Sequence, residues 1–279
     1  MTSSSNSDKT LLLDGLISIE YNTTDRYAII SLCSKPVNSL TQPMMQGIID
    51  AIELVEKNKA MNAIIFTSAV PKIFTAGLDL KSMYQVPKDK FIEFWSTLQK
   101  FFLKVYICPL FTISLINGQC FAGGCLFSLA CDYRIIHNDY SIGLNETKFG
   151  LVPPNWFCDA YETVIGKRQC ELHIQLGTLH TAQEALKIGL VDEVHTDFEV
   201  MKNSAIMQVK KWNKVHQVAR RASKYVLRKP LYDKITEISK SDIEFASNWV
   251  GSPEVQKALG TYLQSLQKKP EASQRSSKL

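Results

Sequence analysis

Short apolar runs alternate with helical repeats along the first 200 residues of the chain. Runs rich in Ile, Leu and Phe, which are typical of buried strands, occupy 27–32, 62–67, 110–116 and 133–136. Apolar residues also recur at every third or fourth position over 41–58 and 91–105, which predicts two helices. Thr41 and Pro43 are residues that favour a helix start there. Strand, helix and strand joined by short links predict a right-handed parallel crossover.

Helical patterns dominate the later part of the chain. Further helices are predicted over 125–130, 157–165, 167–176 and 181–188, and almost everything after 196 is helical. We therefore expect an α/β fold with a boundary near residue 200. The expected regions are a disordered tail at 1–13, an α/β core at 14–200, a helical region at 201–267 and a flexible tail at 268–279.

Composition indicates an ordinary globular protein with a substantial core. The chain has 279 residues, of which 45% are hydrophobic and 21% charged, and its net charge is +5. Much of the basic excess lies between Lys210 and Lys229. That cluster can be a solvated helix face, or it can help to hold an anionic ligand such as a nucleotide phosphate. The chain lacks zinc-finger spacing and an aromatic RNA-binding signature, so a nucleic-acid partner is not expected.

Cysteine usage and hydropathy restrict the compartment and the cofactors. The seven cysteines do not follow a metal-ligand spacing, so we expect reduced thiols and no metal site. No stretch is long and apolar enough to predict a membrane span. The final tripeptide, Ser277-Lys278-Leu279, matches the address that the peroxisomal import receptor reads. The sequence therefore predicts that receptor as a partner and the peroxisome matrix as the location.

Two glycine-containing turns follow predicted strands. One spans 74–80 (FTAGLDL) and the other spans 118–125 (GQCFAGGC). Gly123 and Gly124 precede a predicted helix, so they leave unpaired N–H groups at its start. Two such turns at neighbouring strand ends can place two donors on one oxygen, as in an oxyanion hole. Small residues at strand ends also serve turning and packing alone, and these two turns do not decide between the readings. Neither turn matches a phosphate-binding loop or a dinucleotide fingerprint.

One carboxylate stands in an otherwise apolar stretch. Glu146 lies within 142–151 (IGLNETKFGL). A glutamate in a turn is usually at the surface. In a dry pocket beside Leu144 or Leu151, however, desolvation would raise its pKa and make it a better base.

In combination, these motifs resemble the crotonase (enoyl-CoA hydratase/isomerase) superfamily over roughly 17–194. The motifs that carry the resemblance are 74–80 (FTAGLDL), 117–118 (NG), 122–125 (AGGC) and 131–134 (CDYR). The stretch 142–147 (IGLNET) is similar to that of the members that shift a double bond from C3 to C2 of an enoyl-CoA in fatty acid β-oxidation. The resemblance implies a crotonase-like spiral of ββα units with a C-terminal helical extension.

Site roles follow from the resemblance residue by residue. The backbone N–H groups of Leu78 and Gly123 would hold the thioester oxygen, and Glu146 would be the catalytic base. The acyl-CoA substrate is expected to meet Ala76, Gly77, Leu78, Asp79, Leu80 and Gly123. No cofactor is implied, because CoA enters as part of the substrate.

One departure from the family pattern favours isomerisation over hydration. Leu126 stands where the hydratases carry their first glutamate, and leucine cannot activate water. The Gly-rich turn of the hydratases is replaced by 152–156 (VPPNW), a bulkier wall. A dienoyl-CoA isomerase, an enoyl-CoA hydratase and a non-catalytic acyl-CoA binder stay open as alternatives. Asp79 is either a second acid or a turn residue. Trp156 and Phe157 line either the acyl pocket or the core.

The helical region after residue 200 carries more apolar surface than one solvated helix needs. Its apolar residues include Trp212, Val215, Val218, Ile235 and Trp249. In the superfamily such helices resemble a cover over the active site and a trimer contact. A homotrimer, or a hexamer made of two trimers, is therefore expected.

Overall fold

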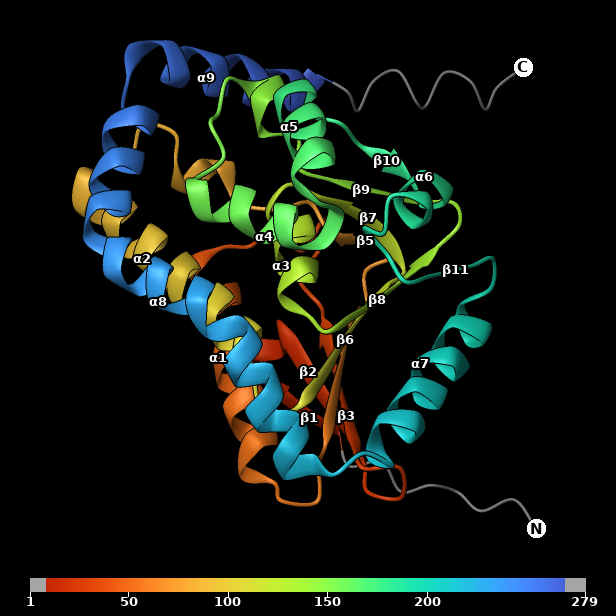
Figure 1. Ribbon diagram of the computed structural model, residues 1–279. Coiled ribbons are helices and arrows are strands. Elements are labelled where there is room, and N and C mark those ends of the chain that lie inside the picture. Colours follow the sequence, from red (N-terminus) through yellow and green to blue (C-terminus); the bar gives the residue numbers. More distant parts are fainter. Residues whose placement is uncertain (1–8, 269–279) are drawn as a thin grey trace, which may run out of the picture.

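A computed structural model describes residues 9–268 as two sheets enclosed by helices (Figure 1). The larger sheet has the order β1-β2-β3-β4-β6-β8-β11. Its strands are β1 (Lys9–Leu12), β2 (Ile17–Asn22), β3 (Tyr27–Leu32), β4 (Ala63–Ser68), β6 (Phe111–Ile116), β8 (Tyr133–His137) and β11 (Glu193–His195). The smaller sheet has the order β10-β9-β7-β5. Its strands are β5 (Lys72–Thr75), β7 (Gly118–Phe121), β9 (Ser141–Gly143) and β10 (His180–Thr181).

Helices cover both faces of the larger sheet. They are α1 (Gln42–Lys57), α2 (Lys88–Tyr106), α3 (Gly123–Ala130), α4 (Asn155–Ile165), α5 (Lys167–Leu176), α6 (Ala182–Lys187), α7 (Phe198–Asn213), α8 (Gln217–Val250) and α9 (Pro253–Lys268). Three 3₁₀ turns interrupt the loops: η1 (Leu13–Gly15), η2 (Leu80–Ser82) and η3 (Glu146–Phe149). Within residues 9–268, no helix combines the length and the apolar character needed to cross a bilayer.

The predicted strand–helix–strand crossover is confirmed. β3 pairs in parallel with β4, and β4 pairs in parallel with β6. Every residue of β4 and of β6 is buried, which explains why apolar residues predominate in both strands. The Thr41 side chain accepts a hydrogen bond from the Met44 N–H at 3.2 Å and so starts α1, as predicted.

Two features of the sheets differ from the prediction. The expectation of a disordered tail at 1–13 is wrong for Lys9–Leu12, which form β1 and pair antiparallel with β2. The smaller sheet was also not predicted. Its strands have two to four residues each and include glycines, so they carry no periodic signal. The tail at 269–279, with the predicted peroxisomal signal, lies outside the described residues.

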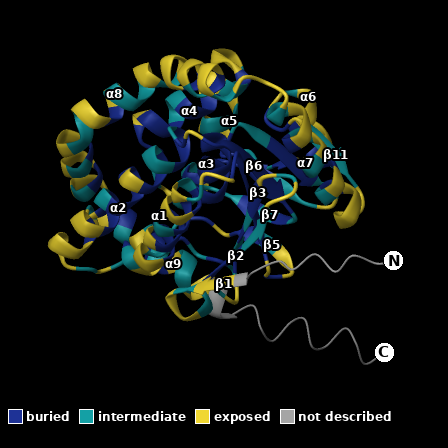
Figure 2. Cartoon of the chain, turned by 90° about the horizontal axis from the view of Figure 1, so that it is seen from below, coloured by how far each residue is buried: buried dark blue, intermediate teal, exposed yellow. Residues whose placement is uncertain are grey.

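The boundary near residue 200 does not divide the molecule into two packed units. Met201, Ala205 and Val209 of α7 are fully buried against one face of the larger sheet, beside Ile65 and Ile113. Therefore α7 belongs to the α/β core and not to a separate cover region. On the opposite face α1 packs on β2 and β3, α2 packs on α1 and α3, α4 packs on α3, and α8 runs along α2 (Figure 1). The sheets lie in the buried centre and the outer helices carry most of the exposed surface (Figure 2).

Candidate active site

The two predicted glycine turns lie directly against each other. Gly77 has a φ of +91°, and a Cβ there would lie 2.8 Å from the Phe121 carbonyl oxygen and 3.0 Å from the Gly123 nitrogen. A Cβ on Gly124 would lie 2.9 Å from the Thr75 carbonyl oxygen. These distances are too short for any side chain, so glycine is required for the turns to meet.

This contact brings the two predicted amide donors together. A Cβ built on Gly123 would lie 3.1 Å from the Leu78 nitrogen. Among the described residues, neither the Leu78 N–H nor the Gly123 N–H donates a hydrogen bond. Ala122, immediately before, has a φ of 50° and a ψ of −118°, a conformation that a non-glycine residue rarely adopts. Two unpaired N–H groups are therefore held side by side by a strained backbone, and their role in holding an oxygen stays a prediction.

A buried polar network that the sequence did not reveal fixes the first turn. The Thr75 hydroxyl donates to the Asn38 carbonyl oxygen at 2.6 Å and accepts from the Gly77 N–H at 3.1 Å. The Asn38 side chain donates to the Phe74 carbonyl oxygen at 3.0 Å. Asn38 lies in a loop with no motif, so its sequence context gives no signal of this role.

The second turn is fixed through the opposite end of α3. The Arg134 guanidinium donates to the Cys131 carbonyl oxygen at 3.1 Å, and the Arg228 guanidinium donates to the Ala130 carbonyl oxygen at 2.7 Å. These cations neutralise carbonyls that no helical N–H can reach. The motif at 131–134 therefore has a structural role: it fixes the C-terminal end of α3, the helix whose N-terminus carries the Gly123 amide.

Asp132 organises this end of α3 as a buried ionic cluster. Its carboxylate accepts from Lys224 Nζ at 2.7 Å and from the Thr112 N–H at 2.9 Å, and it lies 2.8 Å from Arg228. Burial alone would raise the pKa of Asp132, but the two cations hold it below the usual value. Lys224 and Arg228 therefore belong to neither of the two predicted roles of the basic cluster, because they point inward.

Glu146 is buried at the first position of η3. The residue is 8% exposed, and neither carboxylate oxygen accepts a hydrogen bond from another described residue. The Ala122 N–H donates to the Gly143 carbonyl oxygen at 2.8 Å, so the segment that carries Glu146 leaves β9 beside the second glycine turn. The expectation of a surface glutamate is excluded.

The electrostatic state of Glu146 suits a base. Burial raises the pKa of its carboxyl to about 7. The pKa of the Cys125 thiol, in the first turn of α3, is raised by burial, by Cys120 and by the charge of Glu146. The carboxylate is therefore within electrostatic reach of the helix that presents the Gly123 amide.

Three other residues that the sequence singled out, Asp79, Trp156 and Phe157, have structural roles. The Asp79 carboxylate accepts from the Ser82 hydroxyl at 2.7 Å, which favours the turn interpretation. Trp156 and Phe157 are 0% and 1% exposed and pack in the core, where the Trp156 indole N–H donates to Asp242 at 3.2 Å. Leu126 is fully buried on α3. Within residues 9–268, no cluster of His, Cys, Asp and Glu is arranged to hold a metal.

A sequence profile described as enoyl-CoA hydratase/isomerase matches residues 25–272, most of the chain. The chain belongs to the enoyl-CoA hydratase/isomerase family. It is 37% identical over 244 residues to the mouse protein "Enoyl-CoA delta isomerase 1, mitochondrial", with 87% of this chain and 84% of the relative covered. The human protein of the same name is 34% identical, over 86% of this chain and 80% of its own length.

Solved structures agree with this family membership. The crystal structure of human mitochondrial delta3-delta2-enoyl-CoA isomerase superposes with a TM-score of 0.89 at 33% identity, covering 91% of this chain and 99% of that one. An enoyl-CoA hydratase from Bacillus halodurans superposes with a TM-score of 0.81 at 22% identity, covering 88% and 99%, and shows the fold alone. The predicted crotonase-like α/β fold with C-terminal helices is therefore confirmed.

Proposed function

We propose that this protein is an isomerase that converts a 3-enoyl-CoA to the trans-2-enoyl-CoA in fatty acid β-oxidation. The observation that carries the proposal is the state of Glu146, a buried carboxylate without a hydrogen-bond partner among the other described residues, on the segment that leaves β9 beside the second glycine turn. Similarity to the mouse and human enoyl-CoA delta isomerases over most of the chain supports the same reaction.

The chemistry is a proton transfer within one substrate molecule. Glu146 removes a proton from C2, and the electron pair moves onto the thioester oxygen as a dienolate. The N–H groups of Leu78 and Gly123 stabilise that charge, and the loss of one such donor typically costs about 3–4 kcal/mol of transition-state stabilisation. The protonated Glu146 then returns the proton at C4. CoA is part of the substrate, and the reaction needs no further cofactor.

Hydration of a 2-enoyl-CoA is the main alternative reaction, because the family includes hydratases as well as isomerases. A hydratase needs a second carboxylate to activate water, and Leu126 fills that place with a fully buried apolar side chain. We expect very slow hydration by the purified protein. Rapid conversion of a 2-enoyl-CoA to the 3-hydroxyacyl-CoA would contradict this assignment.

Turnover of a 3-enoyl-CoA by the purified protein, followed by the absorbance of the conjugated product, tests the proposal directly. Glu146→Gln keeps the shape of the side chain and removes the base, so kcat should fall by about 100-fold or more. A dienoyl-CoA isomerase would prefer a dienoyl substrate, and a non-catalytic binder would bind the thioester without turnover. Near-normal turnover by the Glu146→Gln variant would remove Glu146 from the mechanism.

We also propose that the protein assembles as a homotrimer, or as a hexamer of two trimers. Exposed apolar side chains along the first half of α8 support a subunit contact there. Val218, Val226 and Leu227 are 71%, 68% and 79% exposed. Light scattering on the purified protein measures the mass. A monomer at micromolar concentration would contradict the proposal, and Leu227→Glu should weaken the assembly.

Import into the peroxisome matrix is proposed from the tripeptide Ser277-Lys278-Leu279. A fluorescent protein fused ahead of residues 268–279 should enter peroxisomes, because the import receptor reads the free tripeptide. Deleting the tripeptide should leave the fusion outside. Import of both fusions, or of neither, would contradict this location.

A further inference from the structure

A short segment connects the Leu78 amide to the C-terminal part of the molecule. After Leu78 the chain forms η2, where the Met83 N–H donates to the Leu80 carbonyl oxygen at 3.1 Å. It then reaches Gln85, which has a φ of 51° without being a glycine. Backbone in this region persists only where the surroundings hold it. The turn that carries the predicted donor therefore ends in a strained residue that needs support.

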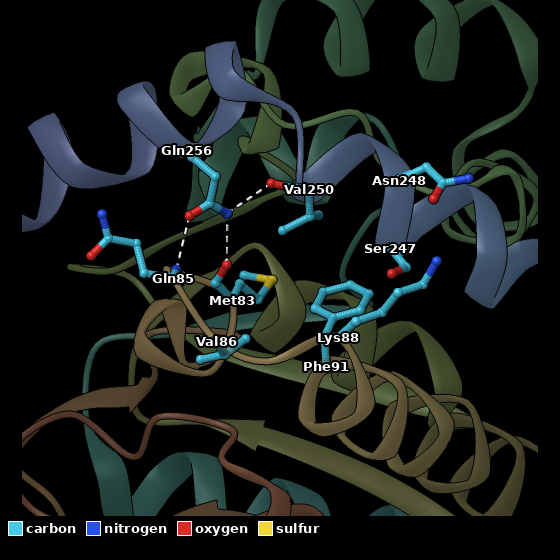
Figure 3. Close-up of a pocket in the computed structure, with 10 residues that line it drawn as sticks. Met83, Gln85, Val86, Lys88, Phe91, Ser247, Asn248, Val250 and Gln256 are labelled. Carbon is cyan, nitrogen blue, oxygen red and sulfur yellow. Dashed lines mark hydrogen bonds between the residues drawn. The ribbon is translucent and has the colours of Figure 1, made fainter.

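On the side that faces α8 and α9, a pocket interrupts the packing of this segment. A cavity of about 460 Å³ separates the segment from the junction of α8 and α9 (Figure 3). Met83, Val86 and Phe91 line it on one side, and Asn248 and Val250 line it on the other. Met83 and Val250 belong to the same buried core, Tyr84 packs against Gly260 of α9, and polar contacts span the pocket itself.

The side chain of Gln256, in the first turn of α9, makes these contacts. Its Oε1 accepts from the Gln85 N–H at 2.8 Å, and its Nε2 donates to the Met83 carbonyl oxygen at 3.0 Å. The same Nε2 donates to the Val250 carbonyl oxygen at 2.7 Å, which ties the segment to the end of α8 (Figure 3). Both donor positions of the amide are used, so its orientation is determined.

The same helix also packs against the Glu146 turn. The ring of Tyr262 lies 4.3 Å from the ring of Phe149, the last residue of η3. A Cβ on Gly150 would lie 3.3 Å from the Cβ of Ala258, so the backbone of that turn touches α9. Val255 and Leu259 are buried and anchor the helix. One helix therefore contacts both the segment that follows the Leu78 turn and the end of the Glu146 turn.

We propose that Gln256 is a positioning residue for the isomerisation, because it fixes the amide-bearing segment to the helix that also supports the Glu146 turn. In this arrangement α9 sets the spacing between the amide pair and the carboxylate. Gln256 does not touch the reacting atoms. The inference rests on the proposed function, since the spacing matters only if both groups act on one substrate.

Spacing of this kind affects the transition state more than the binding of substrate. A shift of about 1 Å between reacting groups can cost on the order of 100-fold in rate. Substrate binding draws on many contacts along the CoA, so it depends less on that spacing. Loss of the Gln256 contacts should therefore lower kcat and leave KM nearly unchanged.

The test compares Gln256→Leu with the wild type and with Gln264→Leu, a matched change at an exposed position of the same helix. We expect kcat of Gln256→Leu to fall by about tenfold, KM to change by less than about twofold, and Gln264→Leu to behave as wild type. Hydrogen exchange of the peptide that contains Gln85 supplies a readout independent of catalysis. The Gln85 N–H should exchange faster in Gln256→Leu alone.

Other results would overturn the inference. These are a wild-type kcat despite faster exchange at Gln85, a loss of kcat without faster exchange, or an equal loss in Gln264→Leu. If Gln256→Leu does not fold, Gln256→Glu replaces it. That variant keeps an acceptor for the Gln85 N–H and loses both donated bonds, so it should show an intermediate exchange rate and a lower kcat. Absence of isomerase activity in the wild type would instead overturn the proposed function, and the exchange result would still stand.

Discussion

Asp132 and Glu146 are two carboxylates near the glycine turns, and their surroundings are opposite in character. Asp132 accepts hydrogen bonds from Lys224 and from the Thr112 amide and lies beside Arg228, and its pKa is held low. Glu146 is buried but has no hydrogen-bond partner among the other described residues, and burial raises its pKa to about 7. Asp132 is therefore a structural ion whose charge is compensated by two cations and a backbone amide.

The difference indicates which carboxylate is available for chemistry. A buried charge without partners costs stability, and a fold keeps such a group where the group has another use. A carboxylate that already holds two cations is a poor base, because its proton affinity is low. The absence of partners at Glu146 therefore carries more functional information than its burial alone.

The largest expected effect on stability comes from removing the charge of Asp132. Asp132→Asn leaves Lys224 and Arg228 buried without their counter-ion, and the loss of one partner of a buried pair costs about 3–5 kcal/mol. Urea unfolding measures the free energy of unfolding. A change below about 1 kcal/mol would show that the cluster is not a main support of α3. Lys229→Ala, which breaks an exposed pair with Asp233, is the control and should have little effect.

A second, opposite effect is expected at Glu146. Since the pKa of Glu146 is higher in the folded protein than in the unfolded chain, folding binds a proton between about pH 4.5 and pH 7. Wild-type stability from this group therefore falls as the pH rises through that window. Glu146→Gln should match the wild type near pH 4 and exceed its free energy of unfolding by about 1–3 kcal/mol at pH 8. Equal stabilities at pH 8 would mean that the ionised carboxylate is solvated.

Catalysis should follow the same ionisation. A carboxylate acts as a base only when ionised, so with Glu146 as the proposed base kcat/KM should rise with pH and level off above about pH 7. Below that value it should fall by about tenfold per pH unit. Initial rates between pH 5 and pH 9 give the profile. A midpoint near pH 4.5 would contradict this prediction, because it would show that burial does not raise the pKa of Glu146 in the free enzyme.

The smallest effect is expected at Asp79. Its carboxylate is engaged by Ser82 in a turn. Asp79→Ala should change kcat by less than about threefold and the free energy of unfolding by about 1 kcal/mol. A fall in kcat of about 100-fold would instead identify Asp79 as a second acid, on the scale of general acid–base catalysis.

The sequence predicted those parts of the fold whose signal is periodic. β4 and β6 are buried at every position, so their apolar runs could be recognised. The short strands β5 and β9 obtain their stability from pairing with distant segments, and a local pattern does not record such pairing. For the same reason the inward direction of Lys224 was not predicted, because it depends on Asp132 lying opposite, whereas Lys210, Lys211, Lys214 and Lys229 are exposed as expected of a solvated helix face.

The candidate site was predicted as a set of residues but not as an environment. Gly77, Gly123 and Glu146 stand in recognisable motifs, and the structure brings the two turns into contact. That the Glu146 oxygens lack partners among the other residues of 9–268 follows from the packing of distant segments and cannot be predicted from its neighbours in sequence. Asn38 supports the first turn from a distant loop, and its sequence context is uninformative.

Helix α3 is only 8 residues long, so its two ends are about 12 Å apart. At that length a helix behaves as a stiff rod, and a tilt caused at one end is transmitted almost undiminished to the other. Inherited changes in the ionic cluster at its far end could therefore silence the enzyme although they never meet the substrate. A survey of inactive variants should find some of them there, with intact thioester affinity and a misaligned Gly123 amide.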